Sequence, residues 1–367
     1  MASMNLAKLL PAVALAIILT TSCLPGQGGA SSSSPAAGPK SPIAQNSAGE
    51  CSQLGTNLEI VRLKGSTTFV VRDITNILNP QTVATFDGSA PQFINQTDVS
   101  FVRGPALMRM SVCGPPAVAV VAKPANGLYE DSYAWSPDGA SVAYVTITGT
   151  TGELHVLSGG RDQTLATVPG LVASQNCPAQ SCGDQSDIRL LYSPDGADIS
   201  FVQNLGGPSL RVWSADGKVL ASNDYQSAEM SAWSGGGLYF RDDKGVELWR
   251  SGSLSLPLPG VAWIRPRASP AGGEVVFATR DSAGVAHVQL LDTATAHVRE
   301  IAKSRSEPAF LNSHLIWYRE ERPRTASDPA TSGPAVPTGK TYIFDLQDNT
   351  ETESLLAGVF DVWPRGA

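Results

Sequence analysis

Charged and aromatic side chains recur on short apolar segments of this sequence, where they could share one site. Those singled out are Glu130, Asp187, Arg189, Trp263, Arg265 and Arg267. Alternate residues of a strand point to opposite sides. If these segments are strands, these residues face one side and apolar neighbours such as Tyr133 and Trp135 face the other. Guanidinium and carboxylate groups beside an indole suit an anionic or sugar-like ligand. The alternative is a water-filled channel whose charges satisfy one another.

The motifs of the common catalytic and cofactor-binding sites are missing from the sequence. The four histidines show no metal-ligand spacing, and no Gly-x-Ser-x-Gly, Walker-type or dinucleotide-binding motif occurs. We therefore predict no catalytic residue, no metal site and no cofactor. Asp138 and Asp195 are expected to cap turns rather than transfer protons. Paired-carboxylate glycosidase chemistry stays open, because two acids that act together need not be close in sequence.

A repeated segment sets the architecture that must position these residues. An apolar strand, a Ser-Pro-Asp-Gly turn and a second strand occur at Ser132–Val145 and Leu190–Val202. Degenerate copies begin at Ser231, Ala268 and Phe310. Equivalent turn positions lie 35 to 57 residues apart, and each copy is followed by two more strand-like segments. Four strands per repeat at this period predict the blades of an all-β propeller.

The Trp-Ser-Pro-Asp-Gly turn at Trp135–Gly139 resembles the WD40-like propeller repeat of the TolB family. The resemblance covers roughly residues 57–367. It implies a β-propeller, and many propellers with this repeat are non-catalytic binding modules.

The two ends of the repeat region are predicted to complete one blade together. Leu58–Leu63, Phe69–Asp73 and Thr82–Phe86 supply three strands without an inner one, and Val359–Arg365 imitates an inner strand. Pairing of these ends leaves no free edge and gives seven blades. Six blades are the alternative, if the N-terminal strands only cap the ring.

The N-terminus predicts export and a lipid anchor. Residues 1–22 carry one charge, Lys8, followed by an apolar run too short to span a bilayer, as in a secretory signal. Cys23 after a small residue resembles a lipobox cysteine, and residues 23–56 have the composition of a flexible tether. We expect the propeller to occupy 57–367, anchored on the outer face of a bacterial membrane. An ordinary cleaved signal is the alternative.

Four further cysteines are expected to form disulfides in an exported chain. Cys177 and Cys182 are close enough to bridge locally, which leaves Cys51 to pair with Cys113.

The net charge of the chain and the lengths of its predicted loops limit the functions that it could have. The net charge of −7, without a basic cluster, argues against nucleic-acid binding. Two insertions, Pro169–Asp187 and Arg319–Lys340, are predicted on the same face, opposite the Ser-Pro-Asp-Gly turns. For the second, a low-complexity segment without fixed structure is the alternative. We expect a non-catalytic module that binds an envelope protein or glycan through this face. The alternative is a propeller hydrolase or lyase that acts on carbohydrate in the channel.

Overall fold

The structure is a computed structural model that describes residues 54–62, 68–113, 117–169, 171, 189–202, 210–223, 229–328, 335–356 and 358–363. All of them belong to one compact unit, Asn46–Ala367. Within these ranges the regular structure is β-strand, apart from one 3-10 turn, η1 (Tyr129–Asp131). The predicted leader lies outside the described residues, as does the tether apart from Leu54–Thr56.

The described strands form seven four-stranded antiparallel sheets, the blades, and the strands of each blade run in order from the inner to the outer edge. Blade 1 comprises β4 (Ser89–Asn95), β5 (Asp98–Arg103), β6 (Ala106–Ser111) and β7 (Val118–Ala122). Blade 2 comprises β8 (Tyr133–Trp135), β9 (Ser141–Thr148), β10 (Thr151–Ser158) and β11 (Arg161–Pro169). Blade 3 comprises β12 (Arg189–Tyr192), β13 (Asp198–Val202), β14 (Leu210–Ser214) and β15 (Val219–Asn223). Blade 4 comprises β16 (Glu229–Ser234), β17 (Gly237–Arg241), β18 (Gly245–Arg250) and β19 (Ser253–Pro259).

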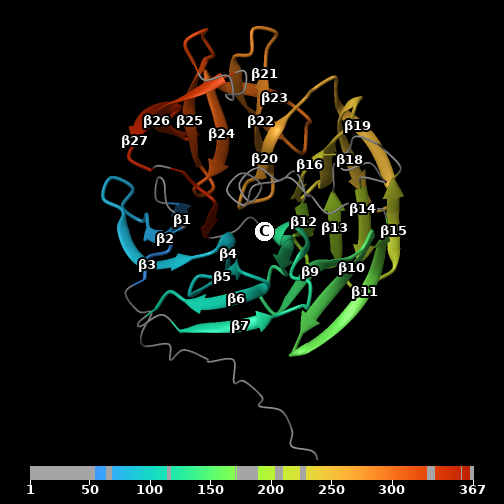
Figure 1. Ribbon diagram of the computed structural model, residues 1–367. Helices are drawn as coiled ribbons and strands as arrows, with labels where there is room; N and C mark the ends of the chain where they lie inside the picture. The colour runs from blue at the N-terminus through green and yellow to red at the C-terminus, as the bar shows by residue number, and fades with distance from the viewer. Residues whose placement is uncertain are drawn as a thin grey trace, which may run out of the picture. The chain divides into compact units, whose positions relative to one another are not determined.

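The remaining blades follow the same order. Blade 5 comprises β20 (Ile264–Ala268), β21 (Glu274–Arg280), β22 (Ala286–Asp292) and β23 (Val298–Lys303). Blade 6 comprises β24 (Arg305–Phe310), β25 (Leu315–Pro323), β26 (Ala335–Asp345) and β27 (Thr350–Ser354). The closing blade comprises β28 (Asp361–Trp363), β1 (Leu58–Arg62), β2 (Thr68–Asp73) and β3 (Gln81–Asp87). Figure 1 shows the blades arranged in a ring, which confirms the predicted seven-bladed propeller over the six-bladed alternative.

The ring is closed by pairing of the two ends of the repeat region, as predicted. β28 pairs antiparallel with β1, so that Leu58 lies opposite Trp363 and Ile60 opposite Asp361. The Asp361 carboxylate also accepts the backbone N–H of Phe93 on β4 at 2.7 Å, which ties the closing blade to blade 1. No strand edge is therefore left exposed between the first and last repeats.

Aromatic side chains of the inner strands pack between neighbouring blades. Tyr133 and Trp135 are buried, as the alternation in β8 predicts. The indole N–H of Trp135 donates to Ser100 Oγ of blade 1 at 2.9 Å. Trp233 makes the same contact with Ser200 Oγ of blade 3 at 2.8 Å. The tryptophan of one repeat and the serine of the preceding one thus form a recurring link between blades, because a buried indole N–H needs an acceptor.

The Ser-Pro-Asp-Gly turns cap themselves. Asp138 Oδ1 accepts the Ser136 hydroxyl at 2.6 Å and the backbone N–H of Ala140 at 3.0 Å. Asp195 accepts the equivalent donors, Ser193 Oγ and the N–H of Ala197. The serine hydrogen bond, followed by the backbone one, lowers the pKa of each aspartate. Both carboxylates therefore act as turn caps, as expected from the sequence.

Candidate functional site

Left-handed residues other than glycine recur beside the first residues of five inner strands. They are Ala90, Asp131, Met230, Arg265 and Glu307, with φ between +45° and +54°. In blades 1, 4, 5 and 6 the residue lies within a register shift between the first two strands. A bulge of this kind re-aims the side chains around it, and each left-handed side chain costs about 1–3 kcal/mol.

Aromatic donors from the following blade hold two of these bulges in place. The Tyr133 hydroxyl donates to the carbonyl oxygen of Ala90 at 2.6 Å. The Trp263 indole N–H donates to the carbonyl oxygen of Met230 at 2.9 Å. The packing between blades therefore fixes the backbone at the ends of the inner strands. Those ends carry the candidate site.

Five charged side chains from blades 5 and 6 form one connected group, which we call the charge cluster. Arg265 Nη1 lies 2.5 Å from Glu307 Oε1, and Arg319 Nη2 lies 2.7 Å from the same oxygen. Arg319 Nη2 is also 3.5 Å from Glu321 Oε1, and Arg280 Nη2 is 2.6 Å from Glu321 Oε2. Each carboxylate is thus shared by two guanidinium groups, across the boundary between the blades.

The topology explains why these residues meet. Arg265 and Glu307 lie near the starts of the inner strands β20 and β24, whereas Arg280 and Glu321 lie at or near the ends of the second strands β21 and β25. The start of one strand and the end of its antiparallel partner lie at the same end of a blade. The charge cluster is therefore on the face opposite the Ser-Pro-Asp-Gly turns, where the two insertions were predicted.

The electrostatics of the cluster favour the ionised form of Glu321. Burial alone would raise the pKa of Glu321, whose side chain is 5% exposed. Hydrogen bonds from Ser306 and Arg280 outweigh this effect and hold that pKa below its usual range. A carboxylate that stays ionised is a poor proton donor, so Glu321 suits charge binding better than general acid catalysis.

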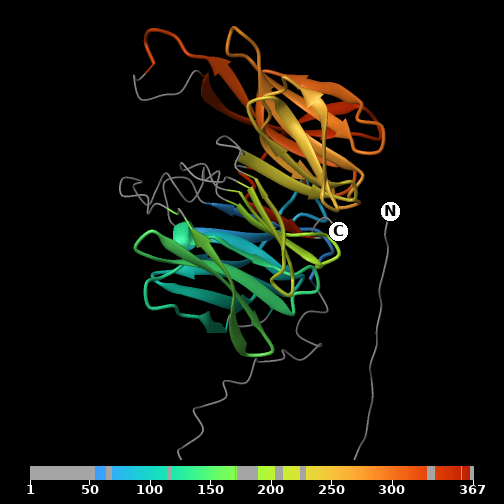
Figure 2. The ribbon, with the colours of Figure 1, turned by 90° about the vertical axis from the view of Figure 1, so that its right-hand side faces the viewer.

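The predicted insertion between the second and third strands of blade 6 is a β-hairpin that we call the arm. Glu321, Arg322 and Pro323 of β25 lie opposite Pro337, Val336 and Ala335 of β26. At its far end Arg322 Nη2 binds Asp328 Oδ1 at 2.6 Å. Figure 2 shows these orange-red strands reaching beyond the rest of the blade. The alternative of a segment without fixed structure is wrong for the described residues, 321–328 and 335–339.

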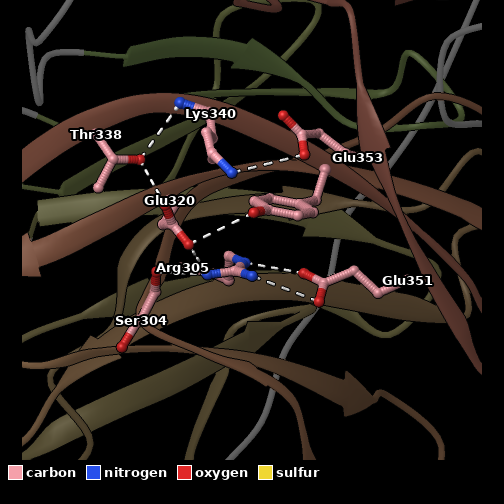
Figure 3. Close-up of polar contacts among 8 residues, drawn as sticks. Ser304, Arg305, Glu320, Thr338, Lys340, Glu351 and Glu353 are labelled. Atoms are coloured by element: carbon pink, nitrogen blue, oxygen red, sulfur yellow. Dashed lines mark hydrogen bonds and ion pairs between the residues drawn. The ribbon is translucent and has the colours of Figure 1, made fainter.

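A second polar group braces the foot of the arm (Figure 3). Arg305 binds Glu351 through Nε at 2.8 Å and Glu320 through Nη1 at 3.1 Å. Its guanidinium carbon lies 4.0 Å from the centre of the Tyr342 ring. Glu320 also accepts a hydrogen bond at 2.6 Å from the hydroxyl of Thr338, which lies on β26, the third strand of the blade. These contacts join all four strands of blade 6 where the arm leaves it.

The structure brings one of the predicted channel residues into the charge cluster, and this residue is Arg265. Arg267 donates through Nη1 to the carbonyl oxygen of Pro266 at 3.2 Å. Trp263 is fully buried between Tyr239 and Phe277, so it has no surface open to a ligand in this structure.

The remaining channel predictions concern residues whose side chains the structure does not describe. Glu130 and Arg189 lie in η1 and β12, and their side chains are outside the described set. Asp187 lies wholly outside the described residues. Ligand binding by all six residues stays a prediction.

Sequence reasoning did not assign four members of the cluster, namely Arg280, Glu307, Arg319 and Glu321. The insertion bounded by Arg319 was the one available signal, because it marks the strand end that carries two of them.

Of the five cysteines, the structure describes Cys113 alone. Cys113 is buried and disulfide-bonded. Cys23, Cys51, Cys177 and Cys182 lie outside the described residues, so their lipidation and pairing stay predictions.

The described part of the chain holds neither a metal-type cluster nor a membrane-spanning helix. There, no group of three His, Cys, Asp or Glu side chains is arranged to hold a metal ion. His287 binds one carboxylate through each ring nitrogen, with Glu300 at 2.8 Å and Asp281 at 3.2 Å. Over the same residues, no helix has the length and apolar character needed to cross a bilayer.

Comparison with known proteins identifies the fold and no family. No family model matches the chain, and no curated protein matches it. A functionally unknown protein from Desulfotomaculum acetoxidans is similar, with 12% identity, a TM-score of 0.51, and 83% of this chain and 96% of that one covered. TolB from Acinetobacter baumannii has 14% identity and a TM-score of 0.43, covering 83% of this chain and 81% of its own.

Enzymes also occur among the similar structures. An oligogalacturonate lyase in complex with manganese has 12% identity and a TM-score of 0.43, with 81% of this chain and 73% of the lyase covered. At such low identity these similarities concern the propeller fold alone.

Proposed function

We propose that this chain is an exported, lipid-anchored β-propeller that binds a protein of the cell envelope through the face carrying the arm and the charge cluster. Export and anchoring are supported by the leader, Cys23 and the tether-like segment that follows it. The observation that carries the binding role is the arm, a braced hairpin that rises beside a partly exposed group of arginines on one face of a rigid scaffold. Recognition loops are commonly built in this way.

A non-catalytic role fits the chemistry of the cluster. Both of its carboxylates are ion-paired with guanidinium groups, and Glu321 is held ionised. Such a group orients and binds charged partners. Its arginine side chains are partly exposed, and electrostatic complementarity of such groups contributes specificity and association rate more than raw affinity.

The test is affinity purification from the native envelope after in-cell crosslinking. The wild type is compared with a variant in which residues 324–334 are replaced by a Gly-Ser segment of equal length. This variant keeps the strands of the arm and removes the side chains of its tip. We expect a specific protein partner with the wild type and its loss in the variant. An unchanged partner set in the variant would exclude the arm tip as the binding element, and absence of any specific partner in both would reject the protein-binding role.

A further inference from the structure

The composition of the charge cluster points to the chemistry of its partner, and this inference rests on the proposed function. Three guanidinium groups and two carboxylates give the cluster a formal charge of +1, in a chain whose net charge is −7. Outside these ion pairs, Arg280 Nη1 donates to the carbonyl oxygen of Gly284 at 3.1 Å, and Arg319 Nε donates to Ser306 Oγ at 3.4 Å. The net positive charge of this partly exposed cluster favours a partner group that carries negative charge.

The arginines are held in place and remain accessible. The side chains of Arg265, Arg280 and Arg319 are 27%, 25% and 32% exposed. Arg319 lies in the middle and shares a carboxylate with each of the other two. Because Glu307 and Glu321 fix the guanidinium orientations, little side-chain entropy is lost when a ligand binds.

The ligand class can be narrowed further. A net charge of +1 matches a single carboxylate, whereas a phosphate dianion would leave negative charge uncompensated. Sugar rings are commonly bound by stacking on an exposed aromatic face, and the strongly exposed large apolar side chains in the described part of the chain include no aromatic residue. Trp263, the aromatic residue nearest in sequence to Arg265, is fully buried.

We propose that the charge cluster binds a carboxylate of an acidic peptide segment in the protein partner. Arg265 and Arg319 receive the carboxylate. Arg280 is a positioning residue, since it holds Glu321, which in turn orients Arg319. The arm, which begins at Glu321, then flanks the bound segment.

Binding of labelled peptides to the full chain in detergent tests this proposal. The probes are a short peptide of alternating Glu and Gly and the same peptide with Gln in place of Glu, followed by fluorescence anisotropy. We expect the Glu peptide to bind more tightly than the Gln peptide. Arg319→Gln and Arg265→Gln should each weaken Glu-peptide binding about tenfold, because each removes a charge-assisted contact.

A matched control separates a specific site from general charge attraction. Arg299→Gln removes the same charge from the exposed outer strand β23 and should leave the affinity unchanged. Arg319→Gln is expected to fold, because Glu307 keeps Arg265 and Glu321 keeps Arg280. A thermal unfolding curve by circular dichroism checks this for every variant.

Three results of the binding assays would overturn the proposal, and one result of the crosslinking experiment would do so as well. The first is a Glu peptide that binds no more tightly than the Gln peptide. The second is a loss of Glu-peptide affinity in Arg299→Gln that equals the loss in Arg319→Gln. The third is a labelled oligogalacturonate that binds more tightly than the Glu peptide and depends on Arg319, which would assign the cluster to an acidic glycan. If a crosslinked partner is lost on replacement of the arm tip and kept in Arg319→Gln, the carboxylate site is wrong and the proposed function stands.

Discussion

Replacing Trp263 by phenylalanine is expected to destabilise the propeller without affecting ligand binding. The indole is fully buried, and its N–H is the donor to the carbonyl oxygen of Met230, a left-handed residue at a bulge. The smaller ring loses apolar burial worth about 1 kcal/mol. The carbonyl left without this donor adds about 1–3 kcal/mol. We therefore expect the free energy of unfolding to fall by about 3 kcal/mol.

Urea unfolding followed by far-UV circular dichroism measures this change, with Trp135→Phe as the matched control. The Trp135 indole donates to a side chain, Ser100 Oγ, which also lies within hydrogen-bond distance of the Tyr133 hydroxyl. A hydroxyl can rotate to another partner and a backbone carbonyl cannot, so the control should lose about 1 kcal/mol less. A loss of unfolding free energy below about 1 kcal/mol in Trp263→Phe would show that the Met230 carbonyl does not need the indole donor. Weakened binding of the Glu peptide at unchanged stability would instead place Trp263 in the ligand site.

Three other predictions concern the anchor, the closing blade and a blade turn. Cys23→Ala should move the protein from the detergent phase to the aqueous phase in phase partitioning, and retention in detergent would reject lipidation. Burial raises the pKa of Glu59 to about 7, more than the opposing attraction of Arg72 lowers it. Between pH 4.5 and 7 the Glu59 carboxyl is then protonated in the folded chain and ionised in the unfolded chain. The free energy of unfolding should therefore fall by up to about 3 kcal/mol as pH rises through this range. Glu59→Gln should flatten this pH dependence in urea unfolding measured at several pH values. An unchanged slope in that variant would assign the pH dependence elsewhere. Gly245→Ala should cost more than about 2 kcal/mol, because φ is +135° and a Cβ would lie 2.3 Å from a carbonyl oxygen of β19. Gly252→Ala is the control, because Gly252 has φ +86° with open space around it, and it should lower the free energy of unfolding by about 1 kcal/mol. Equal losses of unfolding free energy in the two variants would contradict the steric argument.

Much of the fold could be predicted because its signals are local. The Ser-Pro-Asp-Gly turns and the apolar strands around them define a blade within one repeat. All three residues of β8 are buried, and the two large side chains, Tyr133 and Trp135, alternate in sequence with the small Ala134. The closing blade followed from counting, since three strands at one end lacked an inner strand that the other end could supply.

The candidate site was harder to predict from the sequence because it depends on local departures from regular strand geometry. Strict alternation through residues 263–267 predicts Trp263 on the same side of the strand as Arg265 and Arg267. The structure has a left-handed Arg265 and a register shift between Ile264 and Arg267, which break that alternation. Of the five left-handed positions, Asp131 alone has a residue type that is enriched in this conformation, and the other four residue types do not indicate it. The cluster also joins second-strand ends of two blades, a juxtaposition that only the folded ring creates.

Photo-crosslinking from the arm in intact cells tests the proposed binding face most directly. A photoreactive amino acid replaces Ala326 at the exposed tip of the arm in one variant, and Ala140 in an exposed Ser-Pro-Asp-Gly turn in the other. We expect a discrete crosslinked protein from position 326 and none from position 140. The same crosslinked products from both positions, or products from position 140 alone, would contradict a binding face built around the arm and the charge cluster.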